Sequence, residues 1–496
     1  MHNIPMSRIS AELLVGLLVL FLGSSAAAQP TEPRLIAAVK AGDVAAVRAL
    51  LDDGTDVQAA EPDGMTALHW AAHHDHEAIA SLLLEAGGHV STTTRYGLVP
   101  LSLAATNSSP RMLRVLLDAG ADPNHTTGEG ETPLMTVARV GVVDAIDVLI
   151  EYGANVNAIE EWRGQTALMW AASQGNAGAV SVLLQAGANL HATSEGGFTP
   201  LLFAAREGQL PTLEALLDAG ANPDDTLPNG TSALGLTTYN AQYDAAVQLL
   251  KAGANPNAHG QGWTALHQVV WTRRPNLGRN PPFPVPLGQL DGLDMARMLI
   301  AHGADPNLPQ EREPRDGNRN MLDRVGATPF LLAAKAADVP MMQLLADLGA
   351  DPNITTANGA TPMMAAAGVG IWKIGENPGT NSEALAAVTL AWTLGNDVNW
   401  RDGNGDTALH GAVHRGADNI VRFLHEKGAN LDTVNDTGWT PLSIAQGVFY
   451  PNTFNRHPSI VTLLDALGAD PTAGARRPVD LAPWEREALA SNTPRP

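Results

Sequence analysis

The chain has 496 residues, a formal net charge of −21 and no cysteine. The lack of cysteine excludes disulfides, thiol nucleophiles and cysteine-based zinc or iron–sulfur sites from its function. An acidic surface repels phosphate backbones, so nucleic-acid binding is disfavoured. A chain this long exceeds the size of one hydrophobic core, which favours several domains or a repeated array.

The first 28 residues have the pattern of a secretory signal peptide. Arg8 supplies a positive charge, residues 13–22 are an apolar run, and residues 26–28 are alanines of the kind found at cleavage sites. A membrane-spanning helix needs about 20 apolar residues, so an uncleaved anchor is the less favoured interpretation. We therefore predict an exported chain that starts at Gln29, in the periplasm or outside the cell, without a membrane span after cleavage.

A heptapeptide of the type Thr-Pro-Leu-x-x-Ala-Ala then recurs, mostly at steps of 32 to 34 residues. Its copies begin at Thr66, Val99, Thr132, Thr166, Thr199, Ser232, Thr264, Thr328, Thr361, Thr407 and Thr440. Most copies precede a Leu-Leu segment that ends in Gly-Ala-Asp or Gly-Ala-Asn. A related first cycle at 34–58 lacks the heptapeptide, as terminal repeats often do. The sequence thus predicts twelve repeats.

Each part of the cycle has a local cause. Thr132 followed by Pro133 is a helix N-cap with proline at the first helical position. The Leu-Leu segment predicts a second helix, which ends at a glycine such as Gly120 in a left-handed conformation. One such helix pair cannot bury its apolar face alone, so the pairs must stack on each other.

These cycles closely resemble the ankyrin repeat, whose pattern D-x-x-G-x-T-P-L-H-x-A-A-x-x-G-H precedes an apolar helix and G-A-D-V-N-A. The resemblance covers about residues 33–470. It implies an all-α, curved solenoid of about twelve helix pairs joined by hairpin-like loops. Similar bacterial proteins are generally non-catalytic binders, so it also implies recognition of a protein partner on the concave side.

Four insertions interrupt the period, and a tail follows the last repeat. The insertions lie at 273–292, 308–326, 368–383 and 447–459, and the C-terminal tail is 471–496, with a short helix possible at 481–489. Insertions in repeat arrays commonly map to one face, often the binding face. We expect these loops to pack on each other beside the C-terminal half; the alternative is drift in surface loops, which tolerate added length.

The stretch TALHWAAHHDHE, residues 66–77, suggests a metal site at first sight. The resemblance implies instead that His69 and His76 are structural, as His69 is the histidine of T-P-L-H. It places His73 and His74 at two variable positions that face the binding surface. A histidine held by scaffold hydrogen bonds is a poor metal ligand, so we expect no metal and no cofactor. Asp75 replaces the usual glycine for no reason visible in the sequence.

Candidate contact residues are the aromatic and arginine side chains at variable positions of repeats five to eight. They are Trp162, Phe198, Arg206, Tyr239, Trp263 and Trp271, to which His73 and His74 are added. Aromatic residues and arginine are the usual anchors of protein interfaces. The alternative for the loop aromatics is packing on the neighbouring loop. Trp70 and Trp170 are expected in the core or between repeats, whereas His414 and Arg415 occupy the variable positions of repeat eleven.

The motifs of metalloproteases, serine hydrolases and P-loop enzymes are absent from the sequence. We therefore predict a non-catalytic, monomeric scaffold that binds a protein partner on its concave surface. A second hypothesis is small-molecule or glycan binding between the C-terminal insertions and the concave face. Trp372, Phe449 and Tyr450 would supply stacking rings for that ligand.

Overall fold

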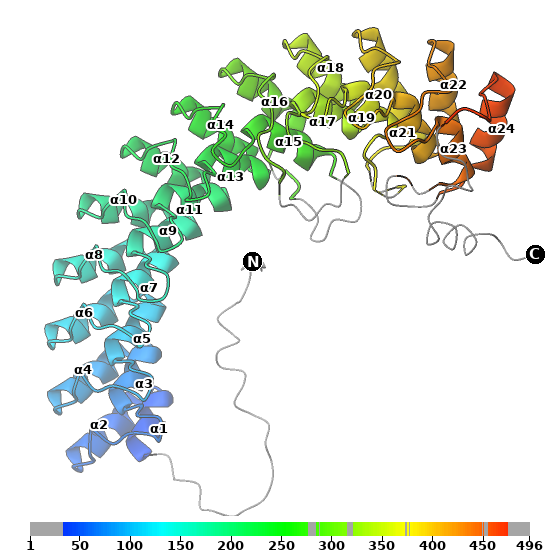
Figure 1. The fold of residues 1–496 in the computed structure, drawn as a ribbon. Coiled ribbons are helices and arrows are strands. Elements are labelled where there is room, and N and C mark those ends of the chain that lie inside the picture. Colours follow the sequence, from blue (N-terminus) through cyan, green and yellow to red (C-terminus); the bar gives the residue numbers. More distant parts are fainter. Residues whose placement is uncertain are drawn as a thin grey trace, which may run out of the picture.

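The computed structural model describes residues 33–275, 284–286, 288–314, 321–372, 374–375, 377–448, 450 and 455–474. Within these residues the chain is an all-α array of 24 helices that form twelve pairs, as predicted. The pairs stack along a curved arc (Figure 1). The predicted signal peptide, Phe449 and all of the tail beyond residue 474 lie outside the described residues.

The first helix of each pair lies on the inner, concave side of the arc (Figure 1). These inner helices are α1 (Arg34–Lys40), α3 (Ala67–His73), α5 (Pro100–Asn107), α7 (Pro133–Val140), α9 (Ala167–Gln174), α11 (Pro200–Glu207), α13 (Ala233–Tyr239), α15 (Ala265–Arg273), α17 (Pro329–Lys335), α19 (Pro362–Ala367), α21 (Ala408–Arg415) and α23 (Pro441–Gln446).

The second helix of each pair lies on the outer, convex side. These outer helices are α2 (Val44–Asp52), α4 (Glu77–Glu85), α6 (Pro110–Asp118), α8 (Val143–Glu151), α10 (Ala177–Gln185), α12 (Leu210–Asp218), α14 (Tyr243–Lys251), α16 (Gly292–Ala301), α18 (Val339–Asp347), α20 (Asn381–Thr393), α22 (Asp418–Glu426) and α24 (Pro458–Leu467). None of the helices described combines the length and the apolar character needed to cross a bilayer.

The inner helices begin as their sequences predict. The side chain of Thr132 accepts a hydrogen bond from the backbone N–H of Met135, and Pro133 occupies the first turn, where its missing N–H costs nothing. The alanine pair of the heptapeptide is fully buried, as at Ala71 and Ala72. Small side chains here let neighbouring inner helices approach closely, which builds one continuous core along the array.

Hairpin-like loops, which we call fingers, lead into the inner helices. Fingers 4, 5 and 6 are residues 127–131, 160–165 and 194–198, and one backbone hydrogen bond closes each of them, from the N–H of the first residue to the carbonyl of the last. Backbone bonds also join fingers 4, 5 and 6 to one another: Glu161 N–H donates to Glu129 O, and Glu195 N–H to Arg163 O. The fingers therefore form a connected edge along the array.

Asparagines of the Asp-Pro-Asn and Asn-Val-Asn segments link successive repeats. The amide of Asn157 donates to Gly187 O at 3.0 Å and accepts from the N–H of Asn189 at 2.7 Å. Asn257 does the same with Gly303 and Asp305. These bonds explain why asparagine recurs at this point of the cycle.

Asp75 lies where the inner helix of repeat two turns into the outer helix. Its φ is +56°, in the left-handed region. The equivalent residues Gly141, Gly175 and Gly208 also have positive φ, so the same turn takes a left-handed residue in these repeats as well. Aspartate tolerates that conformation better than most other residues, which accounts for an irregularity that the sequence alone left unexplained.

The described parts of the insertions lie between helices. The loop predicted at 368–383 ends earlier, because Thr380 caps α20 and the helix starts at Asn381. Two insertions touch each other where the N–H of Met321 donates to Gly370 O at 3.1 Å. Their described parts lie on the concave side of the C-terminal repeats (Figure 1).

Candidate functional site

The three T-P-L-H histidines, His69, His267 and His410, join neighbouring repeats. In each, Nδ1 lies 2.8 to 2.9 Å from the hydroxyl oxygen of the capping threonine, and Nε2 lies 3.1 to 3.3 Å from a backbone carbonyl of the next repeat. A carbonyl only accepts, so Nε2 carries the proton and Nδ1 accepts. Burial lowers the pKa of His267 and of His410 to about 4, so these rings stay neutral scaffold groups.

His73 and His74 lie exposed at the end of α3. The His74 ring stacks between Trp70 and His76, with centroids 5.6 Å from each. Burial is the main cause that lowers the pKa of His74, and the nearby His73 lowers it further. Among the residues described, no group of three or more His, Asp or Glu side chains is arranged to hold a metal ion.

One hollow of the concave side crosses three consecutive repeats, and we call it the aromatic groove. Its volume is about 910 Å³, and its lining comes from fingers 4, 5 and 6, the helices α7, α9 and α11, and the residue Gln209. Three predicted contact residues, Trp162, Phe198 and Arg206, line it together. Among the lining residues that were not predicted contact residues are Arg139, Arg163, Trp170 and Phe203. Trp170, expected to pack within the array, is half-buried and lines the groove as well.

Finger 5 is one residue longer than its neighbours. Its closing bond runs from Glu160 to Gln165, whereas the bond of finger 6 spans one residue less, from Ser194 to Phe198. The buried Glu160 carboxylate accepts the backbone N–H groups of Trp162, Arg163 and Gln165 at 2.7 to 3.1 Å. The step of 34 residues between Thr132 and Thr166 was the sequence signal for this enlarged turn.

Trp162 lies on the enlarged turn, and 63 % of its surface is exposed to solvent. Its neighbours are fixed on both sides, since Glu161 bonds to finger 4 and the Arg163 carbonyl to finger 6. A large apolar ring is thus exposed on a backbone that has little freedom to move. Exposed aromatic rings on a rigid support are typical of binding surfaces.

An arginine lies over each ring of the groove. The guanidinium carbon of Arg163 lies 4.1 Å from the ring centroid of Trp162, and that of Arg139 lies 4.9 Å from Trp170. Arg206 lies 4.9 Å from Phe198 and 5.2 Å from Phe203, and the two phenyl rings are 5.0 Å apart. These cation–π contacts keep the arginine heads beside the groove.

The other predicted aromatic residues do not reach this groove. Trp263 and Trp271 pack edge-to-face on each other, 5.4 Å apart. With the Gln268 amide turned to satisfy its neighbours, its oxygen accepts from Trp263 Nε1 at 3.2 Å. Both indoles therefore pack within the array. Tyr239, at the end of α13, is 38 % exposed but does not line the groove.

The two variable positions at the end of each inner helix divide the molecule in two. In repeats two to seven, which we call the open half (α3 to α14), at least one of the two residues is exposed. In repeats nine to twelve both are buried, and repeat eight is intermediate; we call repeats eight to twelve the covered half (α15 to α24). His414 and Arg415, at the variable positions of repeat eleven, are therefore not exposed to a partner.

The insertion between α19 and α20 explains this burial. His414 donates from Nε2 to Ile371 O at 3.1 Å, and Arg415 donates to Gly379 O at 2.9 Å. From the other side, the ammonium group of Lys335 donates to Asn377 Oδ1 at 3.3 Å. The insertion thus occupies the concave surface that a partner would otherwise contact.

The second hypothesis placed a glycan or small molecule in this region. Tyr450 is buried there: its hydroxyl donates to Asp406 Oδ2 at 2.7 Å, and its ring packs against His414. Its ring is thus not available for stacking on a sugar. The hollow beside it that the described residues enclose has a volume of about 80 Å³. Burial and the neighbouring Asp406 raise the pKa of Asp402, which lines that hollow, to about 6.

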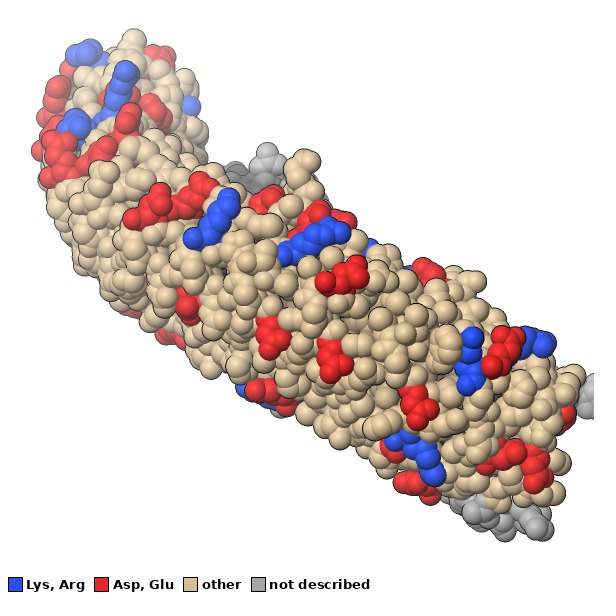
Figure 2. Space-filling view, turned by 90° about the horizontal axis from the view of Figure 1, so that it is seen from above, with Lys and Arg blue, Asp and Glu red and all other residues tan. Residues whose placement is uncertain are grey.

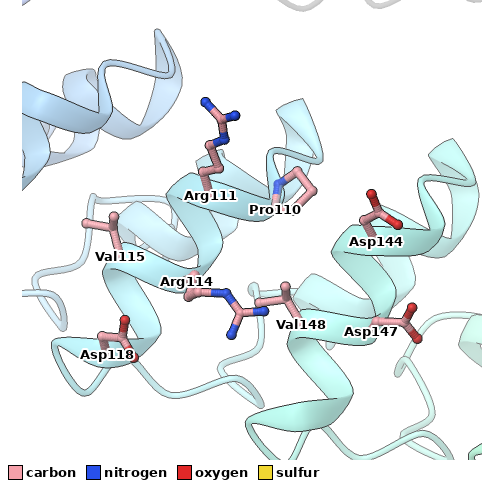
Figure 3. Close-up of a pocket in the computed structure, with 8 residues that line it drawn as sticks. All are labelled: Pro110, Arg111, Arg114, Val115, Asp118, Asp144, Asp147 and Val148. Atoms are coloured by element: carbon pink, nitrogen blue, oxygen red, sulfur yellow. The ribbon is translucent and has the colours of Figure 1, made fainter.

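A second hollow, of about 560 Å³, lies on the convex side between α6 and α8. Figure 3 shows Arg114 extending from α6 toward α8, where it pairs with Glu151 at 3.0 Å. Most of the lining side chains are charged, and the apolar ones are Pro110, Val115 and Val148. This surface lacks the aromatic anchors of the groove. On the face shown in Figure 2, acidic and basic side chains are scattered without a continuous basic patch.

Comparison with known families gives matches along most of the array. Models described as ankyrin repeats in three copies match residues 19–94, 35–127, 101–194 and 201–279. Models of many ankyrin copies match 393–445 and 178–217, and a single ankyrin repeat matches 325–357.

Similar proteins include human ankyrin repeat and SOCS box protein 16, 30 % identical over 43 % of this chain and 42 % of that protein. The zebrafish putative palmitoyltransferase ZDHHC13 is 30 % identical over 32 % of this chain, and the Arabidopsis thaliana E3 ubiquitin-protein ligase KEG is 25 % identical over 30 %. These alignments cover 21 % and 8 % of the two relatives, both of which are enzymes by name.

Among solved structures, the human ASB11 ankyrin repeat domain is 27 % identical and matches with a TM-score of 0.41, over 45 % of this chain and all of that one. The chain spans less than half the length of the curated relatives it matches. The family matches themselves extend over more than half of the chain, and they coincide with its stacked helix pairs. The chain therefore belongs to the ankyrin repeat family.

Proposed function

We propose that this chain is a non-catalytic, monomeric scaffold that binds a protein partner through the aromatic groove of its open half. The exposed Trp162 carries the proposal, because a buried carboxylate and two neighbouring fingers hold its backbone in place. Exposing an indole to water is unfavourable unless a partner covers it. A fixed ring also loses little conformational entropy when a partner binds.

The groove has the dimensions and composition of a site for part of a polypeptide. Its volume of about 910 Å³ spans three repeats, and rings from fingers and helices alternate with polar groups along it. In protein interfaces, clustered aromatic and arginine side chains contribute most of the binding free energy. Ankyrin repeats typically serve as scaffolds for protein–protein interaction. The membership of this chain in that family supports the same role here.

The location that we propose for this interaction is the periplasm or the extracellular space. It rests on the first 28 residues, with their apolar run and alanine cleavage pattern. Expression of the full chain with a C-terminal tag, followed by N-terminal sequencing, tests it. We expect a mature chain that begins at Gln29, and precursor accumulation after Ala26→Leu with Ala28→Leu. Recovery of the intact N-terminus from the cytoplasm would contradict export.

Affinity capture from an envelope extract tests the binding proposal. The full chain is compared with Trp162→Ala and with the matched control Tyr96→Ala. Tyr96 is 61 % exposed, also on a finger and also stacked with an arginine, but it lies outside the groove. We expect a stoichiometric protein whose affinity falls about 30-fold with Trp162→Ala and is retained with Tyr96→Ala. Equal retention by both variants would rule out the groove as the binding site.

A further inference from the structure

The glutamates of the aromatic groove outnumber its arginines by five to three. Three glutamates have internal partners. Glu160 accepts the backbone N–H groups of finger 5, Glu131 accepts from Thr136 at 2.7 Å and Glu207 accepts from Arg206 at 2.7 Å. Within the described structure these three carboxylates are already satisfied.

The remaining two, Glu129 and Glu195, are exposed on fingers 4 and 6. Neither carboxylate has an ion pair or a side-chain hydrogen bond among the residues described. They lie on the fingers on either side of the one that carries Trp162, and Glu195 lies beside Gly164 of finger 5. Two unpaired negative charges thus flank the main apolar anchor.

The arginines of the groove do not offer an equivalent site for an acidic partner. Arg206 pairs with Glu207, and Arg139 lies 3.8 Å from Glu131. Arg163 stacks on Trp162. The chain as a whole carries a net charge of −21. Its long-range electrostatic field therefore favours the approach of cationic groups.

We infer that the occupant of the groove is a basic, extended segment of a protein partner, an inference that rests on the proposed function. One aromatic or aliphatic side chain of this segment packs between Trp162 and Phe198. Lysine or arginine side chains on either side of it pair with Glu129 and Glu195. The rings supply the apolar area, and the two carboxylates select the sign of the charge.

Selection from a random peptide library displayed on phage tests this inference with the full chain as bait. Clones retained by the wild type and lost with Trp162→Ala are sequenced, and one of them is synthesised. We expect net positive peptides with an apolar residue among the basic ones. Affinity should fall about tenfold with Glu129→Gln/Glu195→Gln and should fall as salt rises.

The matched control is Glu85→Gln/Glu426→Gln, which removes two exposed charges at the ends of α4 and α22 on the convex side. We expect it to leave the affinity nearly unchanged. Acidic or neutral clones, or equal loss with both double variants, would overturn the basic partner while leaving the groove as a binding site. If no clone distinguishes wild type from Trp162→Ala, the groove itself fails as the site.

Discussion

The open and covered halves are built from the same repeat, yet they treat the same two positions in opposite ways. Arg206 and Glu207 of repeat six lie at the surface of the groove, whereas His414 and Arg415 of repeat eleven are 1 % and 7 % exposed. Stacked helix pairs recur in both halves. The difference comes from one insertion, which brings its carbonyl groups onto the ends of the inner helices.

This comparison shows that position in the repeat does not by itself define a contact residue. In the open half, at least one of the two variable residues of each repeat is exposed. In the covered half, the chain itself supplies the partner, and the variable residue becomes part of the core. Substitutions at variable positions of the open half should therefore mainly weaken binding. Substitutions at the same positions of the covered half should mainly lower the free energy of unfolding.

The largest effect on stability is expected from Arg415→Ala. The change removes two donors from Gly379 O and Asn381 Oδ1 and leaves a cavity beneath the insertion. We expect a loss of about 3 kcal/mol in the free energy of unfolding. Arg206→Ala, at the first variable position of the open half, should cost about 0.5 kcal/mol. Urea unfolding of both variants measures the difference, and similar losses would remove the distinction between the halves.

Trp271→Ala locates the boundary between the halves. The indole packs on Trp263 and lies 6.3 Å from the ring of His267, so its loss should cost about 2.5 kcal/mol of stability. Because Trp271 lies outside the groove, affinity for a groove-binding peptide should stay unchanged. A loss of affinity without a loss of stability would extend the binding surface into repeat eight.

The sequence predicted the repeats well because each cycle has local causes. The cap at Thr132, the left-handed turn at Gly141 and the amide of Asn157 each act within one or two repeats. The cover over the C-terminal half depends on contacts between distant segments. Arg274, for example, bonds to Glu383, 109 residues further along the chain, and no period reveals such a contact.

The candidate site was predicted in part for the same reason. Trp162 and Phe198 lie on the loops just before a capping threonine, and Arg206 lies at a variable position at the end of an inner helix. The repeat pattern places both positions on the concave side, so a common face followed from that pattern. The mutual packing of Trp263 and Trp271 did not follow from it, because side-chain pairing depends on geometry within one repeat. Trp170 was expected in the core or between repeats because its position in the heptapeptide does not show that it borders a hollow.

The pH dependence of stability should also differ between the halves. The pKa of His414 is lowered from 6.5 to about 4, mainly by burial and to a lesser extent by the nearby His457. The unfolded chain takes up this proton near pH 6.5 and the folded chain only near pH 4. The stability that neutral His414 contributes is therefore fully present above pH 6.5 and is lost as the pH falls toward 4.

His414→Gln measures this contribution, since the glutamine amide still donates to Ile371 O. When the pH is lowered from about 7 to about 5, the free energy of unfolding of the wild type should fall by about 2 kcal/mol more than that of the variant. The exposed His73, at the same position of repeat two, is the control, and His73→Gln should follow the wild type. Parallel pH curves for all three proteins would contradict the neutral, buried state of His414.

A smaller effect than those of Arg415→Ala and Trp271→Ala is expected from Glu160→Gln, which tests how the open half positions Trp162. The glutamine keeps one acceptor oxygen for three backbone N–H groups, so the enlarged turn of finger 5 should loosen at a cost of about 1 kcal/mol. Trp162 itself is unchanged, so any loss of affinity reports on its support. We expect about fivefold weaker peptide binding and higher mobility of the Trp162 indole by fluorescence anisotropy.

Ser194→Ala is the matched control for a turn without the extra residue. It removes the side-chain oxygen of finger 6 that accepts from the N–H of Phe198. If affinity survived Glu160→Gln unchanged, the partner rather than the finger would fix the position of the indole, and the groove would not be preformed.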